Sequence, residues 1–415
     1  MVNKNRVNRT VDIAVIGGGI AGLWTLARLH KLGYQAVLFE ADQLGCVQSG
    51  ASQGIIHGGT KYALTGKLTH SSQSIQQMPQ RWKDCLDGRG EIDLRQAKKL
   101  SEHQYLWSNK SLAAKITGFF ASKVMTSRMQ HLQEKNYVTP FNQADFSGEL
   151  YQLDEPVLDI QSVINTLREQ FSDFIFQGDV KDISEEPIDN NELSESCCYH
   201  IAFSEKNINI IAGTVILTAG AGNEKLLSCL NFTQPAMQRR PLLMPMLKAN
   251  ESILPKMYAH CLGASALPKM TITTHHLSSN QTVWYLGGEI AEKGVGRTIE
   301  EQVMQAKEEL QSLMPWMDFS QCQWSALAID RAEAKMSDGS RPVEPAVFRK
   351  NQVITAWPVK LAMAPIMVDK IINELEALNI KKHSQTLLFD AEDLQSMLRA
   401  QTSPMPWEKV QLWIS

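Results

Sequence analysis

Hydrophobic residues at 11–16, VDIAVI, form a short apolar run that ends directly in glycine. A run of this kind is typical of a parallel strand that is buried on both faces. The residues that follow have an amphipathic helical pattern, and a second strand-like run then ends in the carboxylate of Glu40. This order predicts a strand, a tight turn, an amphipathic helix and a second strand.

The tight turn carries glycines at the spacing G-x-G-x-x-G, in Gly17, Gly19 and Gly22. The first permits the turn, the second lets backbone approach a pyrophosphate, and the third lets the helix pack closely on the strand. The start of the helix offers free N–H groups and a positive dipole end to the phosphate. Glu40 follows at the distance of an acid that binds ribose. The unit predicts a dinucleotide site, and the alternative is an ordinary strand–helix turn.

Periodicity predicts further elements along the chain. Asp159 can N-cap a helix at 160–170, and a helix at 365–378 begins with Pro365. Other helices are expected at 68–86, 123–135 and 300–314. Strands are expected at 102–107, 173–183, 198–204, 208–211, 214–217 and 353–355.

The composition shifts at residue 239, and the chain is rich in strand patterns up to about residue 324. This part predicts a mostly antiparallel domain with the helix at 300–314 as its cover. We therefore expect an α/β chain with a discontinuous Rossmann-like domain and an antiparallel-sheet substrate domain. The expected boundaries are 1–95, 151–232 and 325–382 for the first, 96–150 and 233–324 for the second, and 383–415 for a tail.

The 415 residues carry a formal net charge of −3, which does not indicate nucleic-acid binding. Seven scattered cysteines without a C-x-x-C pair favour reduced thiols in a cytoplasmic protein over a disulfide framework or a metal site. No apolar run approaches the roughly 18 residues that span a bilayer. Peripheral contact with a membrane and the oligomeric state stay open.

Four stretches together resemble the D-amino-acid oxidase superfamily of FAD oxidoreductases. They are DIAVIGGGIAGL with Glu40, the loop SGASQGIIHGG, the turn TAGAG at 218–222, and the final strand, turn and helix. The string IIHGGTKY is most similar to the glycerol-3-phosphate dehydrogenase branch. The chain length and LGGEIAEKGVGR are more similar to the glycine-oxidase, sarcosine-oxidase and 2-hydroxy-acid branches, so no single branch is indicated. The resemblance turns the generic dinucleotide site into an expected FAD site.

By position, the resemblance implies that the first turn and Glu40 hold the ADP half of FAD. The loop after Glu40 would line the ribityl chain and ring, and Val180 would meet adenine through its backbone or else be a core strand residue. The residues implied to bind FAD are Gly17, Gly19, Ile20, Ala21, Gly22, Glu40, Ala41, Gln48, Ser49, Gly54, Ile55, His57, Val180, Ala219, Gly220, Lys360, Leu361 and Ala362.

His57 and Arg331 are candidates for catalysis and substrate binding. Imidazole can exchange a proton near neutral pH, so His57 could act as a general base, or it could only pin its own loop. In amine oxidases of the superfamily, an arginine at the place of Arg331 clamps the substrate carboxylate, which suits the guanidinium fork. Salt bridges from Arg331 to Asp330 or Glu333 are the alternative, and Arg341 is a second candidate for the clamp.

Lys360, Tyr258 and Tyr285 complete the candidates. Lys360 could face the flavin C2 carbonyl and stabilise the anion of reduced flavin, or be a solvated lysine at a turn. Tyr258 and Tyr285 could form a substrate wall or lie in the core. Two departures from the family matter: the turn at 357–363 has no glycine, and no phosphate-binding cluster is recognisable.

The expected activity is oxidation of a C–N or C–O bond in a small amino or hydroxy acid, by hydride transfer to flavin N5, with oxygen or quinone as electron acceptor. One alternative is a glycerol-3-phosphate-type dehydrogenase that delivers electrons to quinone. Another is an NAD enzyme, which the flavin-like loop and TAGAG disfavour. The last is a flavoprotein whose FAD is structural and which binds a partner.

Overall fold

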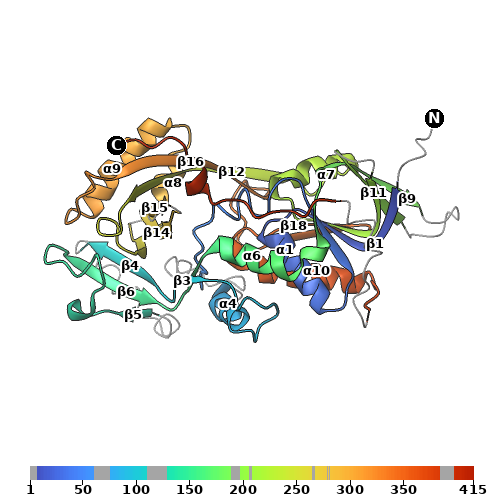
Figure 1. The fold of residues 1–415 in the computed structure, drawn as a ribbon, viewed down its shortest axis with the longest axis horizontal. Coiled ribbons are helices and arrows are strands. Elements are labelled where there is room, and N and C mark those ends of the chain that lie inside the picture. Colours follow the sequence, from blue (N-terminus) through green and yellow to red (C-terminus); the bar gives the residue numbers. More distant parts are fainter. Residues whose placement is uncertain are drawn as a thin grey trace.

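Two eight-stranded sheets lie side by side along the long axis of the molecule (Figure 1). The computed structural model describes residues 7–59, 75–109, 129–187, 197–204, 208–263, 267–277, 279, 281–383 and 397–415. Both expected parts of the fold are present: a mostly parallel sheet with helices, and a mostly antiparallel sheet with a covering helix.

The first sheet has a parallel centre in the order β18, β11, β1, β2, β8. The predicted strand–helix–strand unit is confirmed as β1 (Val7–Ile16), α1 (Ile20–Lys31) and β2 (Ala36–Glu40). The remaining strands of this sheet are β8 (Ile175–Gln177), β9 (Val180–Pro187), β10 (Cys197–Phe203), β11 (Ile208–Leu217), β17 (Ala346–Lys350) and β18 (Val353–Trp357).

Helices cover one face of the first sheet and a β-meander covers the other. On the helical face, α1, α4 (Met78–Leu86), α6 (Ile160–Gln170) and α10 (Ala364–Ala377) share one apolar core. The predicted cap of α6 is confirmed, since the Asp159 side chain accepts a bond from Ser162 N–H. On the opposite face, β9, β10 and α7 (Asn223–Cys229) close a second core. A parallel sheet covered on both faces explains the apolar residues 13–16 at the end of β1.

The second sheet has the order β16, β12, β15, β14, β13, β4, β6, β5. Its strands are β4 (Gln104–Asn109), β5 (Met129–His131), β6 (Gly148–Leu153), β12 (Met237–Ala249), β13 (Tyr258–Cys261), β14 (Met270–His276), β15 (Thr282–Gly287) and β16 (Gln323–Ala334). The covering helix is α9 (Ile299–Leu313), which starts with a capping box between Thr298 and Glu301. A short helix, α8 (Glu289–Glu292), follows β15, and a small two-stranded sheet pairs β3 (Lys99–Ser101) with β7 (Val157–Leu158).

Several predicted boundaries differ from the structure. The strand predicted at 173–183 is two strands, β8 and β9, and the described part of the helix predicted at 123–135 begins with β5. The remainder of that helix, and residues 68–74 of the helix predicted before α4, lie outside the described residues. The domain boundary expected at residue 325 falls inside β16, which pairs along its length with β12 of the second sheet.

Residues 397–415 connect the two sheets. Isolated bridges join Leu44 to Thr402 and Phe176 to Arg399 in the first part, and Trp324 to Ile414 in the second. Between them, the ring of Trp407 stacks on His275 of β14, with centroids 3.9 Å apart. In the part of the chain that the structure describes, no helix is both long and apolar enough to cross a membrane.

Candidate functional site

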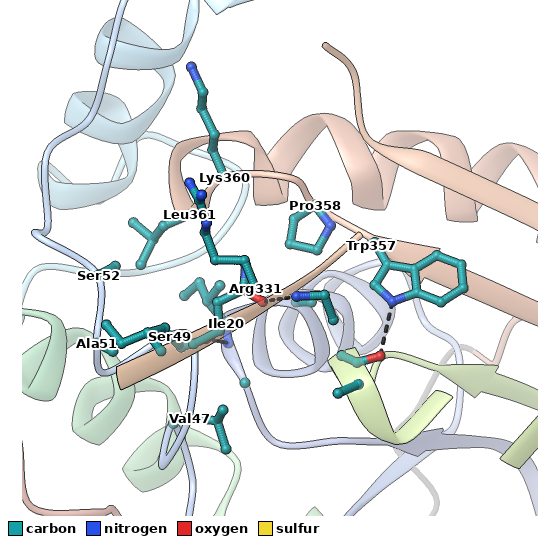
Figure 2. Close-up of a pocket in the computed structure, with 18 of the residues that line it drawn as sticks. Ile20, Val47, Ser49, Ala51, Ser52, Arg331, Trp357, Pro358, Lys360 and Leu361 are labelled. Atoms are coloured by element: carbon teal, nitrogen blue, oxygen red, sulfur yellow. Dashed lines mark hydrogen bonds between the residues drawn. The ribbon is translucent and has the colours of Figure 1, made fainter. Parts of the chain in front are cut away.

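A cavity of about 650 Å³ lies between the two sheets, and part of its lining is shown in Figure 2. One wall consists of segments that follow β1, β2, β11 and β18, at the carboxyl ends of the parallel strands. Ligands of open α/β sheets bind in this place. The opposite wall comes from β12, β13, β14, β15 and β16 of the second sheet.

The glycine turn after β1 is as close-packed as the motif predicts. Gly17 has φ +110°, and a Cβ there would lie 2.5 Å from the Cα of Ala219. A Cβ on Gly22 would lie 1.9 Å from the carbonyl oxygen of Gly17. Gly17 and Gly19 line the cavity, whereas Gly22 is the position where helix and turn touch. The turn predicted at Gly17 and the close helix packing predicted at Gly22 are present, and Gly19 lies at the cavity.

The N-terminus of α1 opens on this turn. Its N-cap is Gly19, which makes no side-chain capping bond, and the first turn of the helix holds no acidic residue. The N–H of Ile20 donates to Ser49 Oγ at 2.9 Å, which ties the following loop to the helix. An uncapped helix start that faces a cavity suits a diphosphate, because its N–H groups need acceptors and its dipole favours negative charge.

Glu40 ends β2 and lines the same cavity. Its carboxylate accepts from Gly18 N–H at 2.5 Å and from Asp42 N–H at 3.0 Å. Burial raises the pKa of Glu40, and these hydrogen bonds oppose that effect. The backbone bonds fix the direction of the side chain, and a carboxylate retains further acceptor capacity for ribose hydroxyls.

The remaining residues that the resemblance implies come together at this cavity. Gln48 also crosses to the second sheet, since its Oε1 accepts from Ala332 N–H at 3.2 Å. Apart from Gly22, all residues expected to bind FAD line the cavity: Gly17, Gly19, Ile20, Ala21, Glu40, Ala41, Gln48, Ser49, Gly54, Ile55, His57, Val180, Ala219, Gly220, Lys360, Leu361 and Ala362. The chain therefore fits FAD by its uncapped helix, its close backbone approach and its placed acid.

The turn after β18 is tight although it contains no glycine. Val359 has φ +64°, and Lys360 N–H donates to the Pro358 carbonyl at 2.7 Å. A β-branched residue rarely takes this left-handed conformation. Trp357 holds the base of the turn, because its indole N–H donates to the Gly220 carbonyl at 3.0 Å (Figure 2). The backbone thus makes a tight turn without glycine and accepts local strain.

A group of polar side chains lies beyond His57. The Nδ1 atom of His57 is 3.8 Å from the Oε2 atom of Glu155, a buried carboxylate. Glu155 also accepts from Gly58 N–H at 2.7 Å and from the amide of Gln104. The ring of His260 stacks on that of His57 with centroids 5.6 Å apart. Sequence reasoning missed Glu155 and His260, since strand pairing between distant segments brings them here.

Arginines form the second-sheet end of the cavity. Arg331 and Arg341 both line it, and Arg331 extends from β16 toward the turn at 358–361 (Figure 2). Arg331 Nε donates to the Arg240 carbonyl at 3.1 Å, and its Nη2 is 3.5 Å from Glu292 Oε1. Burial and the neighbouring Arg240 and Arg341 lower the pKa of Arg331 to about 10. The expected alternatives, ion pairs of Arg331 with Asp330 or Glu333, are not the ones formed in the described structure: Glu333 pairs with Arg240 and Asp330 with the Arg239 guanidinium.

Lys360 differs in orientation from the other candidates. Its side chain leads away from Ile20 and Ser49 in Figure 2, although the residue lines the cavity. Burial and the charge of Arg341 lower the pKa of Lys360 to about 7, and Glu155 opposes this effect. The ammonium therefore belongs electrostatically with Glu155 and Arg341.

The two tyrosines expected in the substrate wall lie elsewhere. Tyr258 packs in a small apolar cluster with Ile55 and Val157. Tyr285 is fully buried, and its hydroxyl donates to the Ala51 carbonyl at 3.2 Å. Neither residue is in the cavity lining. Both lie on the sheet face that also carries His260 and Gly287, but they pack against Ile55 and Ala51 and so belong to the core. Among the described residues, no group of three or more His, Cys, Asp or Glu is placed to hold a metal ion.

Comparison with known proteins agrees with this site. Residues 12–337 match the family model described as FAD dependent oxidoreductase. A probable FAD-dependent oxidoreductase of Pseudomonas aeruginosa is 44% identical over 381 residues, which cover 91% of this chain and 94% of the relative. The crystal structure of the FAD-dependent oxidoreductase from that organism superposes with a TM-score of 0.79 at 38% identity, over 97% of this chain and 98% of that one.

More distant solved structures share the fold. Glycine oxidase from Geobacillus kaustophilus has a TM-score of 0.63 at 13% identity, over 89% of this chain and 95% of its own. L-alpha-glycerophosphate oxidase from Mycoplasma pneumoniae, solved with FAD bound, has a TM-score of 0.62 at 10% identity, over 95% and 99%. The chain belongs to the FAD-dependent oxidoreductase family of the D-amino-acid oxidase superfamily, and FAD is its cofactor.

Proposed function

We propose that this FAD-dependent oxidoreductase oxidises a C–N or C–O bond of a small amino or hydroxy acid. The observation that supports it is the placement of Arg331 and Arg341 in the lining of the cavity that fits FAD. A guanidinium fork binds a planar carboxylate through two parallel hydrogen bonds, which fixes the orientation of the acid as well as its position. Orientation matters here because the reacting bond must lie at a set distance from the cofactor.

When bound, FAD supplies the acceptor for the hydride that leaves the substrate Cα, at flavin N5. The chain supplies the remaining functions. Arg331 binds the carboxylate. His57 is the proposed acceptor for the proton that leaves the amine or hydroxyl group, so that hydride and proton loss together give the imino or keto product.

Glu155 is the proposed positioning residue for His57. Its carboxylate is buried and lies 3.8 Å from His57 Nδ1, and it does not itself line the cavity. A negative charge there stabilises the imidazolium that forms when His57 takes a proton. The hydrogen bond from Gly58 N–H to the same carboxylate holds Glu155 next to the loop that carries His57.

A glycerol-3-phosphate-type reaction with quinone as acceptor is a second candidate. The specific observation in its favour is again the arginine pair, because guanidinium groups bind phosphate as well as carboxylate. In this second candidate, Arg331 of β16 and Arg341, which follows β16, bind the phosphate group. Oxygen or quinone is the proposed electron acceptor in either case.

Anaerobic bleaching of the bound flavin tests the proposal. The holoenzyme is mixed with a panel of amino acids, N-methyl amino acids, 2-hydroxy acids and glycerol 3-phosphate, and the oxidised flavin absorbance is followed. We expect bleaching by at least one amino or hydroxy acid. Bleaching by glycerol 3-phosphate alone would decide for the second candidate. An unreactive flavin with a stable co-purifying protein would instead indicate a structural FAD in a binding protein.

A further inference from the structure

Three arginines gather where the second sheet meets the cavity. Arg240 on β12 and Arg331 on β16 are directly paired residues of neighbouring antiparallel strands. Arg341 follows β16 and lines the cavity beside Arg331. The exposed fractions of the Arg240 and Arg331 side chains are only 23% and 17%. Three guanidinium groups so close together repel one another unless anions separate them.

Two carboxylates of the protein neutralise part of this charge. Glu333, which is buried, lies 3.0 Å from Arg240 Nε. Glu292 is shared, with its Oε1 atom 3.7 Å from Arg240 Nη2 and 3.5 Å from Arg331 Nη2. Arg240 thus faces two carboxylates, and Arg331 faces one that it shares.

Arg341 has no such partner. Its Nε is buried without a hydrogen-bond acceptor, and no ion pair in the described part of the chain involves its guanidinium. Its positive charge nevertheless acts on neighbouring groups, because it helps to lower the pKa values of Arg331 and Lys360. A buried polar atom without a partner is costly, so the site is built to receive an acceptor at this point.

We propose that the substrate carries two anionic groups, an α-carboxylate for Arg331 and a second carboxylate or a phosphate for Arg341. This inference rests on the proposed function and narrows its substrate class. The charges support the assignment: among the described residues, Glu333 and Glu292 pair with Arg240, Arg331 shares Glu292, and no carboxylate pairs with Arg341. A single carboxylate shared between the two arginines is the competing arrangement, and it predicts no preference for a second anion.

Binding of acids that cannot be oxidised separates the two arrangements without turnover. The dissociation constants of glutarate and succinate are compared with those of butyrate and propionate at constant ionic strength, by calorimetry on the holoenzyme and by the change in the flavin spectrum. 3-Phosphonopropionate distinguishes a phosphate-type second group from a carboxylate. A charge-assisted hydrogen bond contributes about 1.5–3 kcal/mol, so a dianion should bind about tenfold or more tightly than its matched monoanion.

Arg341→Gln should abolish that preference, so that each dianion binds with about the affinity of its matched monoanion. Arg239→Gln is the matched control, because Arg239 is an exposed arginine of β12 that pairs with Asp330 and lies outside the cavity lining. Retained flavin absorbance in both variants shows that they fold. Equal affinity for monoanions and dianions, or a preference that survives Arg341→Gln, overturns the inference.

Failure of this inference is distinct from failure of the proposed function. If monocarboxylic amino or hydroxy acids bleach the flavin and dianions bind no better, the function stands and the inference is wrong. If dianions bind more tightly through Arg341 but no acid bleaches the flavin, the anion assignment stands and the function is wrong.

Discussion

The cavity wall built from the first sheet presents mainly backbone, whereas the wall built from the second sheet presents charged side chains. At the first wall, glycines bring the chain within contact distance of itself and leave the start of α1 uncapped. At the second wall, Arg331 and Arg341 line the cavity, and Arg331 lies near Glu292 of α8. The first wall is thus suited to the phosphates of FAD, and the second to an anionic group. Changes at the two walls should therefore separate cofactor binding from turnover.

Gly22→Ala should have the largest effect, and it acts on the first wall. The added Cβ would lie 1.9 Å from the Gly17 carbonyl, so helix and turn must move apart. We expect a loss of about 1–3 kcal/mol in stability and a purified protein largely free of flavin. The ratio of flavin to protein absorbance measures this. Gly213→Ala is the control, since the nearest atom to its Cβ is 3.2 Å away; equal flavin content in both variants would contradict the prediction.

Arg331→Gln should disable the second wall and leave the first intact. Removal of one partner from a desolvated charge pair costs about 2–5 kcal/mol, so kcat/KM for the best acid should fall by about 100-fold or more. The flavin content should stay at the wild-type level. Steady-state kinetics and the absorbance ratio are measured on the same preparation. Loss of flavin in this variant would show that the walls are not independent.

Glu155→Gln tests the support behind His57. The amide keeps the size of the side chain but removes the negative charge that favours the imidazolium. We expect kcat to fall about 10-fold, with KM within about twofold, and the acidic limb of the pH profile to move to lower pH. A merely structural role would leave the position of that limb unchanged, so the pH profile decides.

Lys360→Met tests the turn that joins the two walls. The pKa of Lys360 is lowered to about 7, so between about pH 7 and 10 the unfolded chain binds a proton that the folded chain does not. Stability from this group therefore rises with pH in that window. Relative to Lys360→Met, the wild type should gain more than about 1 kcal/mol between pH 7 and 9. Apparent melting temperatures of both proteins at equal FAD measure it, and a constant difference would contradict it.

Val359→Gly should have the smallest effect. The Val359 side chain is buried, so both Val359→Gly and Val359→Ala lose its packing. Relative to Val359→Ala, which keeps a Cβ at the left-handed position, Val359→Gly gains about 1–3 kcal/mol from relief of the strain, less about 0.5–1 kcal/mol for the greater freedom of glycine in the unfolded chain. We expect Val359→Gly to melt at a higher temperature than Val359→Ala, with kinetic constants within about twofold of each other. Equal melting temperatures would mean that the left-handed φ stores no strain.

The difference between the two cavity walls also explains what could be predicted from the sequence alone. The strand, the glycine turn, α1 and Glu40 follow one another between residues 7 and 40, so local spacing predicts this wall and most of its residues. Arg240 and Arg331 are 91 positions apart and meet only through the register of β12 and β16. No local pattern reports such a pairing.

Contacts between distant segments explain the other misses. Tyr258 and Tyr285 share a sheet face with the cavity-lining His260 and Gly287. Ile55 and Ala51 cover the two tyrosines, which no strand pattern reports. Glu155 is placed behind His57 by contacts with Gly58 and Gln104, which are distant in the chain. The boundary predicted at residue 325 falls inside β16, whose pairing with β12 no local pattern reports.

The order of the strands in the first sheet has a consequence for biosynthesis. β18 and α10, which complete that sheet and its helical cover, are translated after every strand of the second sheet. The ribosome therefore delivers a finished substrate-side sheet while the cofactor-side sheet still lacks an edge and the turn at 358–361. Domains fold as units during synthesis. The second sheet can therefore fold first, and the flavin pocket is complete only after β18 and α10 have joined the first sheet. FAD consequently binds late, after the ribosome has synthesised the last part of its pocket.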